Sequence, residues 1–278
     1  MKKMFTILGL ALAVSLQAAP KKLLVVETTL EYRHSSIPTI EKVLIQLGTN
    51  SGEFTVDCVR QPPGSGAELK EAIKTALQKL SPESLKDYDG VVFASTTGDL
   101  PIPDKDGFLA WIKAGHAFIG IHAACDTFHG WPAYIDMLGG EFDHHGAQLD
   151  VECLNQDTNN PATAHLEKLW KISLEEVYQF KKYDPAKVHD LLILDKKPEV
   201  MGADGRPAGH FPVAWCKDYG AGKVFYTSLG HREDIIDTDP DLKNRKNSVE
   251  ISKAYQAHLL GGIEWALGLA GANKLTIP

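Results

Sequence analysis

The amino-acid sequence predicts an α/β fold with a mixed central sheet and a strand-rich second half. In the first half, short apolar runs typical of buried parallel strands alternate with amphipathic helical stretches. In the second half, strand-like runs follow one another across turns, without long helices between them. The first pattern is typical of parallel β–α–β units and the second favours antiparallel pairs, so we expect one sheet that contains both.

The elements of the first half follow from runs of apolar residues bounded by turns. Strands are expected at residues 23–26, 54–59, 91–94 and 117–122. Helices are expected where apolar residues recur on one face, at residues 40–47, 67–80, 104–114 and 131–138. The alternation of the two kinds of segment places the helices on the faces of a parallel sheet.

After Asp143 the alternation of strands and helices gives way to successive strands. Further strands are expected at residues 149–154, 177–180, 191–194, 211–215 and 223–228. The charged stretch 168–187 is interpreted as a solvated face with a buried aromatic stripe. Residues 248–269 carry Ile251, Tyr255 and Leu259 at helical spacing and predict a closing helix.

Composition limits the class of protein. The chain has 278 residues, of which 44% are hydrophobic and 23% charged, as in ordinary globular proteins. No linker rich in proline, glycine or serine divides it, so residues 20–278 are expected to form a single domain. The formal net charge of −7 argues against a nucleic-acid partner, which needs a basic face, and against docking on an anionic membrane. The oligomeric state is left open.

Residues 1–19 have the features of a secretory signal peptide. Lys2 and Lys3 precede an apolar stretch at residues 5–16, which is too short to span a bilayer. Cleavage is expected near Ala18 or Ala19, so the protein is predicted to be exported, either to a periplasm or to the medium. Export permits disulfides, but the spacing leaves the pairing open among Cys58, Cys125, Cys153 and Cys216.

Polar side chains follow four of the predicted strands. In an open parallel sheet, ligands bind beyond the carboxyl ends of the strands, so residues distant in sequence can meet at one edge. Candidate substrate-binding residues at this edge are His34, Arg33, Thr97, Trp131, Tyr134 and Glu233. Candidate catalytic residues are His122, His231 and Asp126.

His122 is the strongest of these candidates. It ends an apolar strand and precedes Ala123 and Ala124, a layout that resembles a nucleophile elbow. An imidazole held at such a turn can act as a general base or as a metal ligand. The alternative is a histidine that is hydrogen-bonded within the edge of the sheet.

A divalent metal ion is the cofactor that the histidines suggest, although no local spacing such as His-x-x-x-His identifies it. The candidate ligands are His34, His122, His144, His145 and His231. Adjacent histidines project in different directions, so at most one of His144 and His145 is expected to face the site.

The neighbours of His122 each have two interpretations. Asp126 could orient an imidazole or cap a helix. Trp131 and Tyr134 could form an apolar platform for a sugar ring or pack a helix against the sheet. Cys125 could be a thiolate nucleophile, but its place beyond the elbow favours a packed thiol.

At these residues the chain resembles the ThuA-like family, which is named for trehalose utilisation. The matching segments are 33–38 (RHSSIP), 96–98 (TTG), 120–126 (GIHAACD), 131–134 (WPAY), 138–142 (LGGEF), 176–178 (EVY), 222–231 (GKVFYTSLGH) and 262–266 (GIEWA). Together they span essentially the whole chain after the signal segment, in order.

The resemblance implies a flavodoxin-like sandwich similar to the class I glutamine amidotransferase group. In that group the elbow residue is a cysteine nucleophile, and His122 stands in its place, so glutaminase activity is not expected. The family's association implies a carbohydrate ligand and an enzyme, a hydrolase or lyase, that acts on a disaccharide, glycoside or 3-keto-glycoside. The alternatives are a non-catalytic carbohydrate-binding protein and a hydrolase that depends on Cys125. The sugar and the bond attacked are left open.

Overall fold

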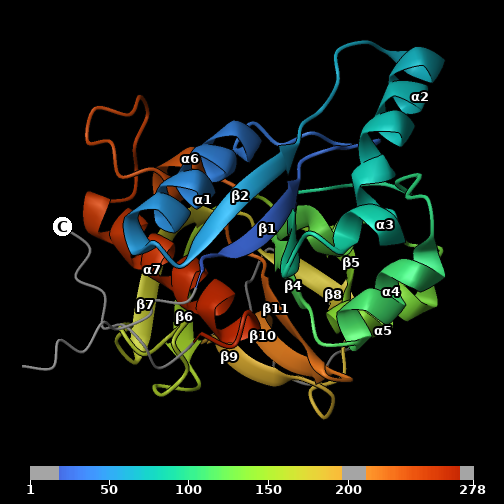
Figure 1. The fold of residues 1–278 in the computed structure, drawn as a ribbon. Helices are drawn as coiled ribbons and strands as arrows, with labels where there is room; N and C mark the ends of the chain where they lie inside the picture. Colours follow the sequence, from blue (N-terminus) through green and yellow to red (C-terminus); the bar gives the residue numbers. More distant parts are fainter. Residues whose placement is uncertain (1–18, 196–210, 270–278) are drawn as a thin grey trace, which may run out of the picture.

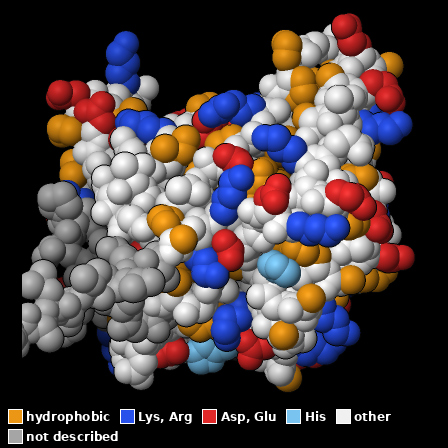
Figure 2. Space-filling model, in the orientation of Figure 1, with side chains coloured by type: hydrophobic (Ala, Val, Ile, Leu, Met, Phe, Trp, Pro, Cys, Tyr) orange, Lys and Arg blue, Asp and Glu red, His pale blue; other side chains and the backbone are white. Residues whose placement is uncertain are grey.

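The computed structural model describes residues 19–195 and 211–269 (Figure 1). The predicted signal segment lies outside the described residues, apart from Ala19. Within the described ranges, no helix combines the length and apolar character that crossing a bilayer requires. On the face shown in Figure 2, acidic and basic side chains are interspersed over the surface.

The described residues contain a mixed sheet in the order β2-β1-β3-β4-β11-β10-β9-β6-β7. Its parallel part consists of β2 (Phe54–Val59), β1 (Lys21–Val26), β3 (Gly90–Ala94), β4 (Ala117–Ile121) and β11 (Gly222–Thr227). Its antiparallel part continues from β11 through β10 (Pro212–Tyr219), β9 (His189–Leu194), β6 (Leu149–Asn155) and β7 (Leu169–Glu175). The parallel part has the strand order of flavodoxin-like folds, and both the predicted α/β class and the mixed sheet are confirmed.

Helices cover both faces of the sheet (Figure 1). One layer contains α1 (Ile37–Ser51), α6 (Glu233–Ile236) and α7 (Val249–Ala266). The other contains α2 (Gly66–Ala76), a 3-10 turn (Leu77–Leu80), α3 (Pro82–Leu85), α4 (Lys105–Lys113) and α5 (Pro132–Leu138). Successive side chains of β1 point to opposite faces of the sheet and join two apolar cores. Leu23 and Val25 pack with α1, while Leu24 and Val26 pack on the opposite face.

The stretch 168–187 has the predicted solvated face and buried aromatic side chains, but one of the two strands that it contains, β7, was not expected. It contains β7 and then β8 (Tyr178–Lys181), and β8 pairs with β5 (Glu141–His145) in a separate two-stranded sheet. In β7, Trp170 and Ile172 are buried while Lys171 between them is exposed. Lys171 faces solvent, whereas Glu175 at the end of the strand is buried, and these charged residues obscure the strand pattern.

Candidate functional site

The strained turn after β4 holds His122 at the edge of the sheet. A 3-10 turn, His122–Asp126, follows β4 directly, and His122 has a backbone φ of +49°. Such left-handed backbone at a residue other than glycine costs about 1–3 kcal/mol and clusters at functional sites. The side chain is fully buried, and Nδ1 lies 2.7 Å from the carbonyl oxygen of Ser228. Since a carbonyl only accepts, Nδ1 carries the hydrogen and the lone pair of the neutral ring lies on Nε2.

His34 and His231 come to His122 from two other strand ends. His34 follows β1 and is 5% exposed, and its Nε2 lies 3.1 Å from Nε2 of His122. His231 follows β11 through Gly230, whose φ of +125° favours glycine. The hydroxyl of Ser36 donates to the carbonyl of Gly230 at 2.9 Å and joins the two loops. Topology therefore gathers three histidines that lie far apart in the sequence.

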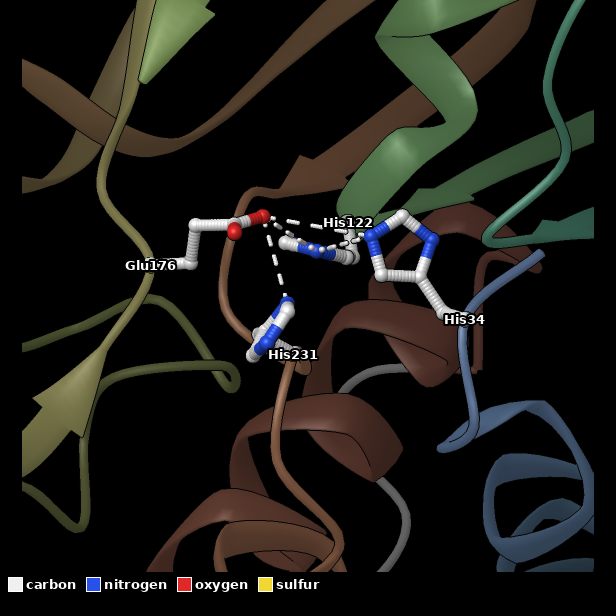
Figure 3. A group of neighbouring side chains, drawn as sticks. All are labelled: His34, His122, Glu176 and His231. Carbon is white, nitrogen blue, oxygen red and sulfur yellow. Dashed lines mark hydrogen bonds and ion pairs between the residues drawn. The ribbon is translucent and has the colours of Figure 1, made fainter. Parts of the chain in front are cut away.

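Glu176, between β7 and β8, completes the group (Figure 3). Its Oε2 lies 3.2 Å from Nδ1 of His231 and 3.6 Å from Nε2 of His122. The same oxygen lies 3.9 Å from Nε2 of His34. These four side chains, here called the histidine–glutamate cluster, offer one ligand atom each, all within 4.8 Å of one another.

The surroundings favour a neutral His122 beside an ionised Glu176. Burial lowers the pKa of His122 to about 4. Burial also opposes ionisation of Glu176, but the imidazoles of His122, His231 and His34 around it hold the pKa of that carboxyl far below its usual range. At His231 burial disfavours the charged ring, yet Glu176 raises its pKa above the ordinary value.

The donor set fits a divalent transition metal. Three imidazole nitrogens and one carboxylate oxygen are ligands that zinc and similar ions accept. Ligands about 2.0–2.1 Å from a tetrahedral ion lie roughly 3.3 Å apart. The separations in the cluster are 3.1 Å between His34 and His122, 3.2 Å between Glu176 and His231, and 3.6 and 3.9 Å from Glu176 to His122 and His34. The carbonyl on Nδ1 of His122 is the outer partner that ligating histidines usually have.

Tyr178 lies against the same ligand atoms. Its hydroxyl is 3.0 Å from Nε2 of His122 and 3.4 Å from Nε2 of His34, and its ring stacks on His122 at 4.4 Å. Burial raises its pKa well above the ordinary range, so the hydroxyl keeps its proton. Sequence reasoning did not select Tyr178 or Glu176 as site residues. The segment 176–178 matched the family pattern, which was the signal available for both.

His144 and His145 lie outside the cluster. Nε2 of His144 contacts the Gln179 amide at 2.9 Å, and its side chain is 44% exposed. His145 approaches more closely, with Nδ1 3.3 Å from Oε1 of Glu176. Strand alternation in β5 separates the two rings, so only His145 reaches the cluster's carboxylate.

Two expectations about the residues after His122 are corrected. Asp126 does orient an imidazole, but it is that of His129, whose Nε2 lies 2.7 Å from Oδ1 of Asp126, rather than that of His122. Trp131 is 9% exposed and Tyr134 is fully buried, so neither offers a free platform to a sugar. Both rings pack with Phe128 beneath the sheet edge, because burial of large aromatic surface outweighs exposure there.

The Cys125 side chain packs in the core and is not accessible to a substrate. Its side chain is buried, and the hydroxyl of Tyr226 contacts Sγ at 3.0 Å. Burial raises the pKa of the thiol, which keeps it protonated. These properties do not support the alternative of a hydrolase that depends on Cys125. The structure describes all four cysteines as free thiols.

The other predicted binding residues brace the loops of the site. The buried hydroxyl of Thr97 donates to the carbonyl of Tyr32 at 2.9 Å. Arg33 donates from Nη1 to the carbonyl of Glu27 at 2.6 Å. Glu233 accepts a 2.6 Å hydrogen bond from the hydroxyl of Ser35. A role in contacting substrate stays a prediction for these three residues.

A second group, Glu27, Glu41 and Cys58, brings ligand atoms together near the start of the His34 loop. Arg60 donates to both oxygens of Glu41 at 2.9 and 3.0 Å and balances its charge. Burial, and then the neighbouring Glu41, raise the pKa of Glu27 to about 8. Glu27 is therefore a buried, protonated acid at neutral pH, and this group needs no cation to balance its charge.

The Glu27→Gln variant is expected to lose less stability than the wild type as the pH rises from about 5 to 8. In the unfolded chain Glu27 ionises near the ordinary glutamate pKa of 4.5, whereas in the folded chain it holds its proton until about pH 8. The folded state thus binds more protons in that window, and the free energy of unfolding falls as pH rises. Urea unfolding at pH 5, 6.5 and 8 measures this, with the exposed Glu68→Gln as control. An unchanged slope would show that Glu27 is ionised in the fold.

Comparison with known proteins agrees with this architecture. The family model described as "ThuA: Trehalose utilisation" matches residues 22–266. No curated protein matches the chain. Among solved structures, a ThuA-like protein from Parabacteroides merdae is 20% identical, with a TM-score of 0.68 over 93% of this chain and 94% of its own.

Two further structures share the fold. A ThuA-like protein from Bacteroides uniformis is 19% identical, with a TM-score of 0.62 over 92% of this chain and 95% of its own. The β-galactosidase from Rahnella sp. R3 is 12% identical, with a TM-score of 0.50 over 90% of this chain but 31% of its own. The resemblance seen in the sequence is confirmed, and the fold is of the glutamine amidotransferase-like, flavodoxin-like kind. The family match over nearly the whole described chain shows that this protein belongs to the ThuA family of trehalose utilisation.

Proposed function

We propose that the protein is an exported, metal-dependent enzyme of carbohydrate catabolism that cleaves a glycoside, with a 3-keto-glycoside as the preferred substrate class. The observation that carries the proposal is the convergence of His34, His122, Glu176 and His231 at the carboxyl edge of the parallel strands. Family membership supports a sugar substrate. The buried imidazoles of His34 and His122 support cation binding.

The chemistry follows from the carbonyl of such a substrate. A ketone at C3 acidifies the hydrogen on C2, so loss of that proton and departure of the group on C1 cleave the glycoside by elimination. A bound divalent cation supplies a Lewis acid that polarises the carbonyl oxygen. The hydroxyl of Tyr178 keeps its proton and lies beside the ligand atoms, where it can donate a hydrogen bond to a sugar oxygen.

A proton acceptor is also required. In this proposal His145 takes the C2 proton, because its side chain is 41% exposed and its Nδ1 lies 3.3 Å from Glu176. That position lets the imidazole meet substrate at the rim and exchange protons with solvent. His122 and His231 are assigned to hold the cation, and Asp126 to fix the neighbouring His129.

Metal analysis of the purified mature protein, followed by product analysis, tests the proposal. We expect a near-stoichiometric divalent cation and release of the leaving group from a 3-keto-disaccharide. Treatment with EDTA should remove the cation and abolish turnover, and adding the cation back should restore turnover. The unoxidised disaccharide is the control substrate and should react far more slowly. Full turnover by metal-free protein would contradict the metal-dependent mechanism, and sugar binding without product would favour a carbohydrate-binding protein.

A further inference from the structure

Tyr32 is an exposed aromatic side chain beside the histidine–glutamate cluster. It is 65% exposed, and among the described residues the only other large hydrophobic side chain in the exposed class is Ile45, at 38%. The ring of Tyr32 meets the ring of His34 at a centroid distance of 4.7 Å and an interplanar angle of 77°. The two rings therefore meet edge to face, and most of the Tyr32 side chain stays open to solvent.

The loop that carries Tyr32 is held in place. The buried Thr97 accepts from the amide of Leu30 through its carbonyl at 3.1 Å and donates from its hydroxyl to the carbonyl of Tyr32 at 2.9 Å. Gly98 packs so closely that a Cβ there would lie 3.0 Å from Cβ of Leu30 and 3.2 Å from Cγ of Glu31. The exposed ring therefore stands on a braced loop, and a ligand that uses it gains contact without having to order the segment.

Tyr32 is joined to the cluster through His34. His34 connects it to the cluster, since the His34 ring lies 4.5 Å from that of His122 and 5.4 Å from that of His231, centroid to centroid. A ligand whose oxygen reaches the cluster's nitrogens would thus lie beside His34, the ring that Tyr32 contacts. The C–H bonds on one face of a pyranose carry partial positive charge and favour the negative face of an aromatic ring.

We propose that Tyr32 is the aromatic platform for the sugar ring whose oxygen reaches the histidine–glutamate cluster. This inference rests on the proposed function and adds the residue that selects a pyranose over an acyclic polyol. It gives Tyr32 the role that Trp131 and Tyr134 cannot take because they are buried.

Calorimetric titration of the protein as purified with a 3-keto-disaccharide, and with the plain disaccharide, tests the platform. Tyr32→Ala is expected to raise Kd and KM roughly 10-fold, with a smaller change in kcat. Tyr32→Phe should restore most of the affinity, because it keeps the ring. Ile45→Ala, on the outer side of α1, is the matched control and should bind as the wild type does. Metal content should be equal in all four proteins.

The outcomes separate this inference from the proposed function. If the wild type binds sugar and Tyr32→Ala binds it equally well, the platform is overturned while the proposed function stands. If Tyr32→Ala also loses its metal, Tyr32 supports the cluster and the platform is overturned as well. If the wild type holds no metal and binds no sugar, the proposed function fails and this inference fails with it.

Discussion

The His122→Ala variant is expected to lose its bound cation and at least about 100-fold in kcat/KM towards a 3-keto-disaccharide. Loss of an outer partner of a metal ligand costs roughly 10- to 100-fold in affinity or activity, and removal of a ligand itself should cost more. His122 is also the residue whose ring contacts the others: Nε2 faces His34, Tyr178 and Glu176. Without it, only His34, Glu176 and His231 remain as ligand residues of the cluster.

Metal content after dialysis and steady-state kinetics measure the effect. His189→Ala is the matched control, because His189 opens β9 far from the elbow, is 58% exposed and pairs with Asp157 at 2.8 Å. Circular dichroism of both variants shows whether the fold is kept. Undiminished turnover by a folded His122→Ala protein would show that His122 is not needed for the reaction. If that protein also holds no metal, the cation is not needed either.

The Trp215→Ala variant is expected to lower the free energy of unfolding by about 3–5 kcal/mol. Trp215 lies in β10, is fully buried and donates from Nε1 to the carbonyl of Leu138 at 2.8 Å. Its ring packs on Phe180 of β8 and on Tyr226, at centroid distances of 5.0 and 4.4 Å. Truncation would leave a cavity under β8 and a carbonyl without its donor, so Tm should fall by on the order of 10 °C.

Thermal unfolding measures this loss, with Trp265→Ala as the control. Trp265 lies in α7, is half-buried, and has Lys223 over its ring at 4.4 Å, so its removal should lower Tm less. Phe180 and Tyr178 belong to the same strand, β8, and Tyr178 contacts the ligand atom of His122. A shift of β8 in the Trp215 variant should therefore also weaken cation binding. A Tm equal to that of the control would show that the ring is not needed to hold β8.

Much of the first half could be read directly from the chain. The run 54–59 is the observed β2, and 91–94 and 117–122 differ from β3 and β4 by one residue at one end. Buried parallel strands are continuous apolar runs, which is a strong local signal. The elbow at His122 was also readable, because small residues directly after a strand mark a sharp turn.

The second half was harder because its signals are not local. Nothing in the sequence around β5 states that it will pair with β8 rather than join the main sheet. Glu176 follows a charged edge strand, so its carboxylate resembled one more solvated group. Asp126 shows the same limit, since its partner His129 is decided by the turn between them and not by the spacing to His122.

The sequence by itself determined the fold class, the family and the strand ends from which His34, His122 and His231 project, because these depend on local hydrophobic patterns and on motifs kept in order. Only the tertiary structure decided that Glu176 and Tyr178 join those histidines, that Trp131 and Tyr134 turn inward, and that Tyr32 stays outside. The physical reason is that burial and ligand geometry arise from contacts between segments distant in the chain, and such contacts leave no periodic trace within either segment.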